Sequence, residues 1–496
     1  MKQNFTLLVA LLLIPLAALS AHAAAQDQPA SSAVDVTITI GSELRQTFVG
    51  FGASSMPEAG RSYMRLAPDR RAKLNDLLWR EARFNTVRLW FALRKYAPTS
   101  GQRRFKDEFP DDFASLLRDA QAAGVRHLVL APCGVPAYLI ERLAIVGEDG
   151  KEKLGPPHLK PEAFNEHAAV IADFIRDAWA QDRIAIEATG IQNEPNTGDD
   201  CEFKPQDIVR SVKLLRAALD SRGLQRVKII APETASCDGA AYAMVDALKA
   251  DEAAWNAIAG VATHSYNMGA IERLARTIAG TDKEYWQTES SVPGPEEPGD
   301  VIRAATEATT FLSDMNHRVT HWIHFIGFLD SDPRDNGTRM IAYDGAVADD
   351  RWIKVFYKYY YLQQLSQTFD VGALFRQSLS TLENDMTWTY GRKPQITAAA
   401  ARNRDGSWGI GISDYTSNDF PQKSQFERDN CGRPSQSFTV TIKVAELAHA
   451  GELRFETHRS GPGLTNSRQE SVVMRDGQVT ISIHPLELVT LRSGGN

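Results

Sequence analysis

The sequence predicts an α/β protein: a (β/α)8 TIM barrel with a C-terminal antiparallel β-sandwich that also takes an N-terminal strand. Short apolar runs alternate with stretches of helical period as far as about residue 370, which is the pattern of a parallel sheet covered by helices. Eight such runs can be counted, the number that closes one barrel. Beyond about residue 372 the chain changes to short alternating strands separated by polar, glycine-rich turns, which is typical of a β-sandwich.

The strand candidates of the barrel are apolar or β-branched runs, and helix candidates lie between them. The strands are expected at Thr47 to Ser54, Asn85 to Phe91, Arg126 to Pro132, Ile184 to Asn193, Arg226 to Pro232, Gly260 to Tyr266, Glu284 to Glu289 and Val319 to Phe325. The helices are expected at Pro68 to Arg83, Asp111 to Ala123, Pro161 to Ala180, Pro205 to Arg222 and Ala240 to Lys249. An open doubly wound sheet would show the same alternation, but no Gly-x-Gly-x-x-Gly phosphate loop follows any strand, which favours the barrel.

A helical, aromatic run from Arg351 to Phe369 leads into the sandwich. Strict alternation of apolar and polar residues then recurs, as in Phe438 to Val444 and Val479 to Ile483. The segment Val34 to Ile40 alternates in the same way and precedes the first barrel strand. We therefore expect the barrel over residues 45–370 and a discontinuous side sandwich made of residues 34–44 and 371–496.

The N-terminus reads as a secretory signal peptide over residues 1–23. One lysine precedes the apolar stretch Phe5 to Leu19, and small residues follow it, so cleavage is expected after Ala23. The stretch is short for a bilayer-spanning anchor. We expect a secreted or periplasmic protein without a membrane span in the mature chain. The formal net charge of −7 offers no electrostatic footprint for nucleic acid, so no nucleic-acid partner is expected.

Four cysteines occur in a chain expected to reach an oxidising compartment. Cys201 and Cys237 fall in neighbouring loops after two strand candidates, so they are the disulfide candidate. Cys133 and Cys431 can pair or stay free. The cysteine spacings do not resemble a zinc cluster, and no metal site is expected.

Two segments carry the chemistry, Gly190-Ile-Gln-Asn-Glu-Pro195 and Trp286-Gln-Thr-Glu-Ser290. Each closes a strand candidate with a carboxylate. In a (β/α)8 barrel such groups meet at the C-terminal ends of the strands although they are far apart in sequence. Two carboxyls facing each other across an anomeric carbon are what glycosidic bond cleavage requires, one as acid/base and one as nucleophile.

These motifs resemble glycoside hydrolase family 30 of clan A, whose members pair a (β/α)8 barrel with a side β-sandwich. The resemblance rests on Gln46-Thr-Phe-Val-Gly-Phe-Gly-Ala53, Ile191-Gln-Asn-Glu-Pro195, His264-Ser-Tyr266, Trp286-Gln-Thr-Glu289 and Lys358-Tyr-Tyr-Tyr-Leu-Gln-Gln-Leu-Ser-Gln-Thr-Phe369. It covers nearly all of the chain after the signal peptide. The Asn-Glu-Pro motif alone is shared by several clan A families, and its conjunction with the other motifs is more specific.

The resemblance implies that Glu194 is the general acid/base and Glu289 the nucleophile. The acid must hold a proton while the nucleophile is ionised. Arg88 matches an arginine near the nucleophile, where a cation keeps a carboxylate ionised. Asn193 matches an asparagine that hydrogen-bonds the sugar 2-hydroxyl. For each of these residues a purely structural role is the alternative: a paired carboxylate, a salt bridge between strands or a turn-capping asparagine.

His264 and Tyr266 are two apart and share one face of a strand. Tyr266 is expected to donate a hydrogen bond to Glu289, and His264 is expected to contact a sugar hydroxyl or to lie in the core. Sugar rings present apolar faces, so aromatic platforms are expected beside the polar groups. The candidates, each with a core position as the alternative, are Trp90, Trp286, Trp322, Phe325 and Phe328.

The function expected is that of a secreted retaining β-glycoside hydrolase that acts on β-linked glycans or glycoconjugates without a cofactor. The resemblance implies β-linked glucose, xylose, fucose or galactose as the sugar. A transglycosylase on the same covalent intermediate and a non-catalytic carbohydrate-binding barrel are the alternatives. An inverting hydrolase is a third, which the separation of the two carboxyl groups distinguishes.

Overall fold

The computed structural model describes residues 33–57, 63–146, 151–198, 200–292, 300–330, 338–383, 386–389, 393–420 and 433–495. From Ala33 onward the described chain forms one compact unit. The predicted signal peptide and Cys431 lie outside the described residues.

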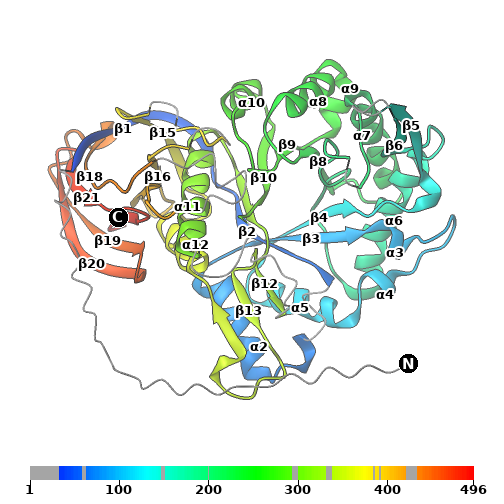
Figure 1. The fold of residues 1–496 in the computed structure, drawn as a ribbon, viewed down its shortest axis with the longest axis horizontal. Coiled ribbons are helices and arrows are strands. Elements are labelled where there is room, and N and C mark those ends of the chain that lie inside the picture. Colours follow the sequence, from blue (N-terminus) through cyan, green and yellow to red (C-terminus); the bar gives the residue numbers. More distant parts are fainter. Residues whose placement is uncertain are drawn as a thin grey trace, which may run out of the picture. The chain divides into compact units, whose positions relative to one another are not determined.

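Eight parallel strands close into a barrel in the order β10-β11-β2-β3-β4-β7-β8-β9, with helices around it (Figure 1). The strands are β2 (Gly50–Ser55), β3 (Thr86–Ala92), β4 (His127–Cys133), β7 (Ala188–Thr189), β8 (Lys228–Thr234), β9 (Gly260–Thr263), β10 (Glu284–Ser290) and β11 (His321–His324). All eight predicted strands are present and in the predicted order. The barrel fold class is therefore confirmed.

Strand β7 is much shorter than the predicted run from Ile184 to Asn193. Just before and just after β7, backbone hydrogen bonds to β4 continue the pairing less regularly. Glu187 N donates to Leu128 O, and Gly190 N donates to Leu130 O. After Gly190 the chain bends, and this bend carries Asn193 and Glu194.

The helices follow the predicted periodicity. In α7 (Pro205–Asp220) the buried residues Ile208, Val212, Leu215 and Leu219 recur at helical spacing, and Pro205 occupies the first turn. The others around the barrel are α2 (Pro68–Asn75), α5 (Asp111–Ala122), α6 (Phe164–Asp182), α8 (Gly239–Ala250), α9 (Glu252–Ala257), α10 (Ile271–Ile278) and α11 (Asp300–Asn316). The last part of the predicted helix from Pro68 to Arg83 is a π-helical turn at Asp76–Glu81.

Strand alternation separates the helix-facing core from the site. In β3, Val87, Leu89 and Phe91 belong to the core cluster shared with the surrounding helices, and the ring of Phe91 stacks on Phe174 of α6 with centroids 3.9 Å apart. The intervening residue Arg88 points to the barrel interior, where it meets side chains of other strands. The closure of the sheet therefore brings together polar side chains that, like that of Arg88, point to the barrel interior.

The C-terminal strands form a nine-stranded sheet that also closes on itself, in the order β1-β15-β16-β17-β22-β19-β20-β21-β18. They are β1 (Val34–Thr47), β15 (Leu374–Ser380), β16 (Ile396–Arg402), β17 (Trp408–Asp414), β18 (Phe438–Val444), β19 (Glu452–Gly461), β20 (Leu464–Arg475), β21 (Gln478–Ile483) and β22 (Leu488–Ser493). The N-terminal strand β1 joins it as predicted, antiparallel to β15 and parallel to β18. Since β1 pairs on both sides, it closes the sheet.

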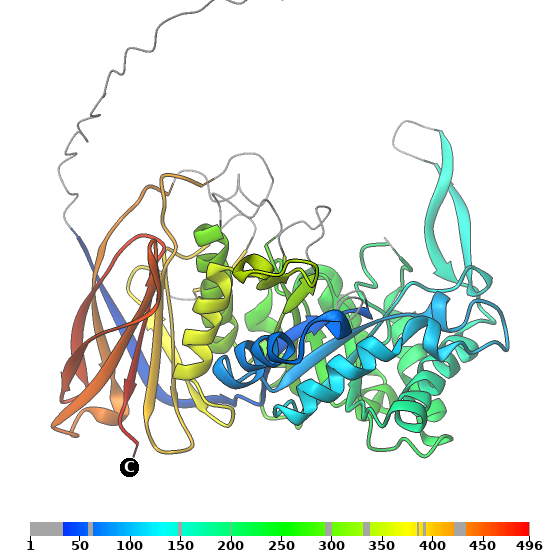
Figure 2. The ribbon, with the colours of Figure 1, turned by 90° about the horizontal axis from the view of Figure 1, so that it is seen from below.

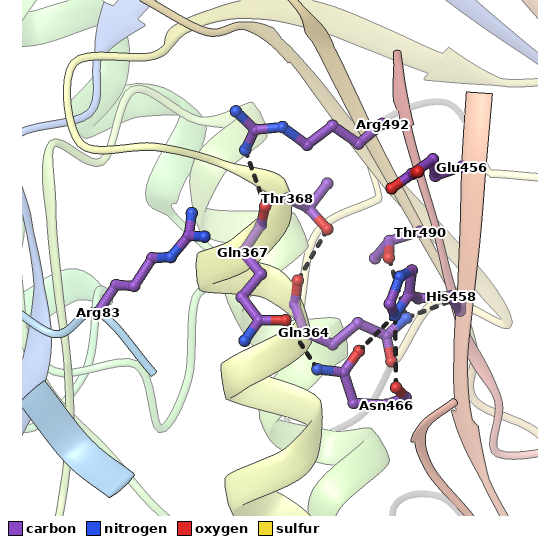
Figure 3. Close-up of a pocket in the computed structure, with 9 residues that line it drawn as sticks. All are labelled: Arg83, Gln364, Gln367, Thr368, Glu456, His458, Asn466, Thr490 and Arg492. Carbon is purple, nitrogen blue, oxygen red and sulfur yellow. Dashed lines mark hydrogen bonds between the residues drawn. The ribbon is translucent and has the colours of Figure 1, made fainter. Parts of the chain in front are cut away.

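Helix α12 (Tyr357–Thr368) holds this sheet against the barrel. Gln364 donates from Nε2 to the carbonyls of His458 and Leu488 and accepts from Ser460. A cavity of about 330 Å³ lies beside these contacts (Figure 3). Its lining is polar and consists of Arg83, Gln364, Gln367, Thr368, Glu456, His458, Asn466, Thr490 and Arg492.

Two small sheets extend the loops of the barrel. The hairpin β5 (Ile140–Val146) and β6 (Glu152–Leu159) follows β4 and projects from the barrel in Figure 2. Strands β12 (Phe328–Asp330), β13 (Ile341–Tyr343) and β14 (Ile353–Val355) form the second. No helix in the described part of the chain is long and apolar enough to cross a bilayer.

Candidate active site

The polar side chains that the sequence singles out meet at the C-terminal end of the barrel. Glu289 lies near the end of β10, and its side chain is only 6% exposed. Arg88 of β3 donates from Nη1 to Oε2 of Glu289 at 2.8 Å, and the Tyr266 hydroxyl donates to Oε1 at 2.7 Å. Both oxygens of Glu289 are therefore held, one by a cation and one by a neutral donor.

Arg88 is fully buried and lies at the centre of the cluster. Its Nη2 donates to Oδ1 of Asn193 at 2.7 Å and to Oε1 of Glu233 at 3.3 Å. Burial alone would lower the pKa of Arg88, but the charges of Glu233 and Glu289 and their hydrogen bonds raise it above its usual value. Arg88 is thus a permanent cation beside Glu289.

His264 links Arg88 to Glu194. Its Nε2 lies 3.4 Å from Nη2 of Arg88, and its Nδ1 lies 3.0 Å from Oε1 of Glu194. A guanidinium can only donate, so Nε2 must accept and the ring proton must sit on Nδ1. His264 is therefore a neutral donor to Glu194, with its tautomer set by Arg88.

Glu194 is the more accessible of the two predicted catalytic carboxylates, with a side chain 22% exposed. Its backbone is left-handed, with φ of 49°, and its N–H donates to the carbonyl of Glu233 at 3.1 Å. Burial would raise the pKa of Glu194, but the hydrogen bond from His264 and the charge of Arg88 lower the pKa below its usual value. The surroundings of Glu194 in this structure thus favour the carboxylate.

The two carboxylates approach each other closely. One oxygen of Glu194, one of Glu289 and a ring nitrogen of His264 all lie within 4.8 Å of one another. Such a group of atoms could also hold a cation. However, both oxygens of Glu289 already accept hydrogen bonds, and the Arg88 guanidinium is adjacent, so a metal ion here would meet an existing buried positive charge.

Glu233 at the end of β8 belongs to the cluster, and sequence reasoning missed it. It is fully buried and pairs with Arg88. The sequence predicts that this strand ends at Pro232, whereas β8 continues for two more residues, to Thr234. The signal was nevertheless the same as for Glu194 and Glu289, a carboxylate that closes a barrel strand.

Several predicted sugar contacts are wrong because the side chains are buried elsewhere. Trp286 is fully buried, stacks on His321 at 3.4 Å and belongs to a core cluster inside the barrel. Trp322 is fully buried against Phe311 of α11. Phe328 is 3% exposed and stacks on Tyr63.

Two further polar candidates also do not reach solvent. Arg88 and His264 are fully buried, and their side chains contact other residues of the site. The sequence predicts that His264 either contacts a sugar or lies in the core, and the structure buries it beside Arg88 and Glu194. Asn193 and Tyr266 are partly exposed.

Trp90 and Phe325 are the partly exposed aromatic residues of the predicted set. Their ring centroids are 5.3 Å apart and their planes meet at 40°. Trp90 lies two residues beyond Arg88 on β3, and Phe325 directly follows β11. Together they form an aromatic pair at the same end of the barrel as Glu289.

The predicted disulfide between Cys201 and Cys237 is wrong: within the described part of the chain both are free thiols, and Cys133 has no disulfide partner there either. The two side chains are buried in different surroundings. Cys201 contacts the backbone of Leu159 in β6, whereas the thiol of Cys237 contacts Tyr285 in β10. Burial raises the pKa of Cys201 to about 12, so this thiol stays protonated.

The architecture is similar to that of solved structures, some of which are described as glycoside hydrolases. The protein SrfJ from Salmonella typhimurium matches with a TM-score of 0.66 at 17% identity, over 94% of this chain and 93% of SrfJ. A GH30 endoxylanase from Clostridium papyrosolvens matches with a TM-score of 0.64 at 15% identity, over 93% of this chain and 100% of the other. The endo-β1,6-glucanase BT3312 matches with a TM-score of 0.63 at 17% identity, over 92% and 94%.

No protein-family model matches the chain, and no curated protein sequence does. At these identities the structural likeness establishes the fold. The chain has the barrel and side β-sheet architecture of the GH30 structures, as its sequence motifs predicted.

Proposed function

We propose that the protein is a retaining β-glycoside hydrolase in which Glu289 is the nucleophile and Glu194 the acid/base. The observation that carries this proposal is the approach of the two carboxylates, with an oxygen of each within 4.8 Å. Retaining enzymes hold their carboxyl groups roughly 5 to 5.5 Å apart, whereas inverting enzymes need roughly 6.5 to 9.5 Å to admit a water between acid and base. The spacing supports retention.

In the first step Glu289 attacks the anomeric carbon while Glu194 protonates the leaving oxygen. Arg88 and Tyr266 each donate a hydrogen bond to one oxygen of Glu289, which fixes the direction of the carboxylate. Oε1 of Glu194 accepts the hydrogen bond from His264, so Oε2 is the oxygen that carries the proton. A substrate over Glu194 displaces water from it, and this desolvation favours the protonated carboxyl that the acid role needs.

In the second step the ionised Glu194 removes a proton from water, and the water attacks the anomeric carbon of the glycosyl-enzyme, which breaks the bond to Glu289 and frees its carboxylate. The neutral His264 donates to Glu194 in this form, which stabilises the carboxylate between the two steps. Asn193 accepts from Arg88 through Oδ1, so its amide N–H groups are left to bind the sugar 2-hydroxyl.

The substrate class proposed is a neutral β-linked glycan or glycoconjugate, with Trp90 and Phe325 against the apolar face of a sugar ring. Structurally similar proteins include enzymes described as an endoxylanase and an endo-β1,6-glucanase, so xylans and β-glucans head the substrate panel. Export is proposed with it, on the strength of the signal-like residues 1–23.

The test is turnover of aryl β-D-glycosides, xylans and β-glucans by the wild type, Glu289→Ala and Glu194→Ala. We expect both variants to lose nearly all activity on natural glycans. Azide should restore turnover of aryl glycosides by Glu194→Ala, because a small anion can attack the glycosyl-enzyme without a general base. NMR of the first-formed product should show a retained β-anomer.

Glu187→Gln serves as a matched control, since this carboxylate pairs with His127 and Lys228 at the opposite end of the barrel. It should keep wild-type turnover. An α-anomeric first product, or full activity in Glu289→Ala, would contradict the proposal.

A further inference from the structure

Glu233 is a third carboxylate in the catalytic cluster, and the two-carboxylate reaction does not call for it. It lies in β8 and is fully buried. A buried carboxylate is costly unless it is paired and hydrogen-bonded. The groups that Glu233 binds must therefore account for its burial.

The side chain of Glu233 binds one terminal nitrogen of Arg88, and Glu289 binds the other. Oε1 accepts from Nη2 of Arg88 at 3.3 Å, while Nη1 of the same guanidinium binds Glu289 at 2.8 Å. A planar guanidinium offers its donors in a fixed fork, so a carboxylate on one nitrogen restricts where the other nitrogen points. Glu233 thus constrains the direction from which Arg88 reaches Glu289.

Space for Glu233 comes from Gly190. A Cβ added at Gly190 would lie 1.7 Å from Oε2 of Glu233, so any side chain there would displace the carboxylate. Oε2 itself finds no hydrogen-bond partner among the described residues. The site keeps this orphan oxygen although it costs stability, which is expected where the group serves the neighbouring residues.

The backbone of Glu233 contacts the other catalytic carboxylate. Its carbonyl accepts from the N–H of Glu194 at 3.1 Å, and both residues have left-handed backbones, with φ of 63° and 49°. Non-glycine residues in this region persist only when their surroundings hold them there. One residue is therefore bonded to Glu194 through its backbone and, through Arg88, to Glu289.

We propose that Glu233 is a positioning residue that sets the geometry of both catalytic carboxylates and shares the positive charge of Arg88 with Glu289. This inference rests on the proposed function. The charged and titratable groups around it are Arg88 from β3, Glu194 after β7, His264 after β9 and, across Arg88, Glu289 from β10. Arg88 thus has two carboxylate partners, Glu233 and Glu289.

The test separates charge from geometry with two variants. Glu233→Gln keeps an oxygen for Arg88 but removes the negative charge, so the acid limb of the kcat/KM profile should move to lower pH by on the order of one unit. Glu233→Ala removes the anchor, so kcat should fall about 100-fold from misplacement of the reacting groups. KM should stay within about threefold in both, because the buried side chain does not contact substrate.

Crystal structures of the two variants supply a readout that does not depend on turnover. Arg88 should stay on Glu289 in Glu233→Gln and move off it in Glu233→Ala. The Glu187→Gln control should leave kcat, KM and the pH profile as in the wild type.

The inference is overturned if Glu233→Gln keeps the wild-type pH profile or if Arg88 is unmoved in Glu233→Ala. A wild type that turns over no glycoside defeats the proposed function instead. In that case the position of Arg88 in the Glu233→Ala structure still decides whether Glu233 positions the cluster.

Discussion

The hydroxyl of Tyr266 donates to Oε1 of Glu289 at 2.7 Å, on the side of the carboxylate that Arg88 leaves open. Burial and the nearby charge of Glu289 raise the pKa of Tyr266 well above its usual value, so the phenol remains a donor throughout the working pH range. Glu289 therefore accepts two hydrogen bonds from different parts of the barrel, one from Arg88 on β3 and one from Tyr266 in the loop after β9.

Tyr266→Phe removes one of these bonds while keeping the ring. A hydrogen bond to a charged group contributes about 1.5 to 3 kcal/mol, so kcat/KM should fall by roughly 10- to 100-fold. Ionisation of Glu289 becomes less favourable, so the acid limb of the pH profile should move to higher pH, opposite to the shift expected for Glu233→Gln. Stopped assays on an aryl glycoside across the pH range measure both effects.

Tyr242→Phe is the matched control, because this hydroxyl donates to the carbonyl of Ala270 away from the cluster. It should leave the pH profile unchanged. If Tyr266→Phe also leaves the acid limb in place, the phenol does not stabilise the nucleophile.

Gly190→Ala should disturb the cluster without adding a charge. The new methyl group would lie 1.7 Å from Oε2 and 2.6 Å from Cδ of Glu233, so the carboxylate has to move and Arg88 with it. We expect a lower melting temperature and a kcat reduced by about 100-fold. Differential scanning calorimetry and steady-state kinetics report the two effects.

Gly239→Ala provides the control, since no atom lies within 4 Å of an added Cβ there. Adding Glu233→Ala to Gly190→Ala should relieve the clash, so the double variant should be no less stable than Glu233→Ala alone. Additive losses of stability in the double variant would show that the two residues do not compete for the same space.

The sequence predicts the barrel well because each strand has its own local pattern and the closed order follows from βα repetition. The predicted strand boundaries are least accurate where the chain leaves regular strand pairing, as it does after Gly190. The bend there, which carries Glu194, is set by contacts with β4 and β8 and not by a local sequence pattern. The N-terminal strand was predicted from alternation alone. Its parallel pairing with β18 depends on the closure of the sheet and has no local signal.

The candidate site was found where a carboxylate stood in a motif, and missed where it did not. Glu233 stands in Ala-Pro-Glu-Thr, which reads as the end of a buried strand. The aromatic predictions failed for a different reason. A tryptophan on a barrel strand can face the interior, as Trp286 does, or the helices, as Trp322 does, and period-two alternation does not say which face reaches the mouth.

A last prediction concerns Asp314, a fully buried acid on α11 behind the site. Its Oδ2 accepts from Ser265 at 2.6 Å and from Trp322 at 2.8 Å. Burial outweighs both bonds and raises the pKa of Asp314 to about 8. The folded protein thus keeps a proton that the unfolded chain gives up above its own pKa of about 3.9.

The sign of the effect on stability follows from this difference. The contribution of Asp314 to the free energy of unfolding is fully present below the pKa that this residue has in the unfolded chain. It is lost as the pH rises through its pKa of about 8 in the folded protein. His167, whose pKa burial lowers to about 4, acts in the opposite direction below pH 6.5. The window for Asp314 is therefore pH 6.5 to about 8, where the loss should be about 2 kcal/mol.

Asp314→Asn mimics the neutral acid, because its amide oxygen can accept from Ser265 and Trp322 in the same way. The variant should be more stable than the wild type near pH 8 and should show a flatter fall of the free energy of unfolding across the window, measured by urea denaturation. Asp414 has a pKa raised to about 8 by burial, so part of the slope should persist until Asp414→Asn is added. A wild-type stability that does not fall between pH 6.5 and about 8 would mean that Asp314 is ionised in the folded protein.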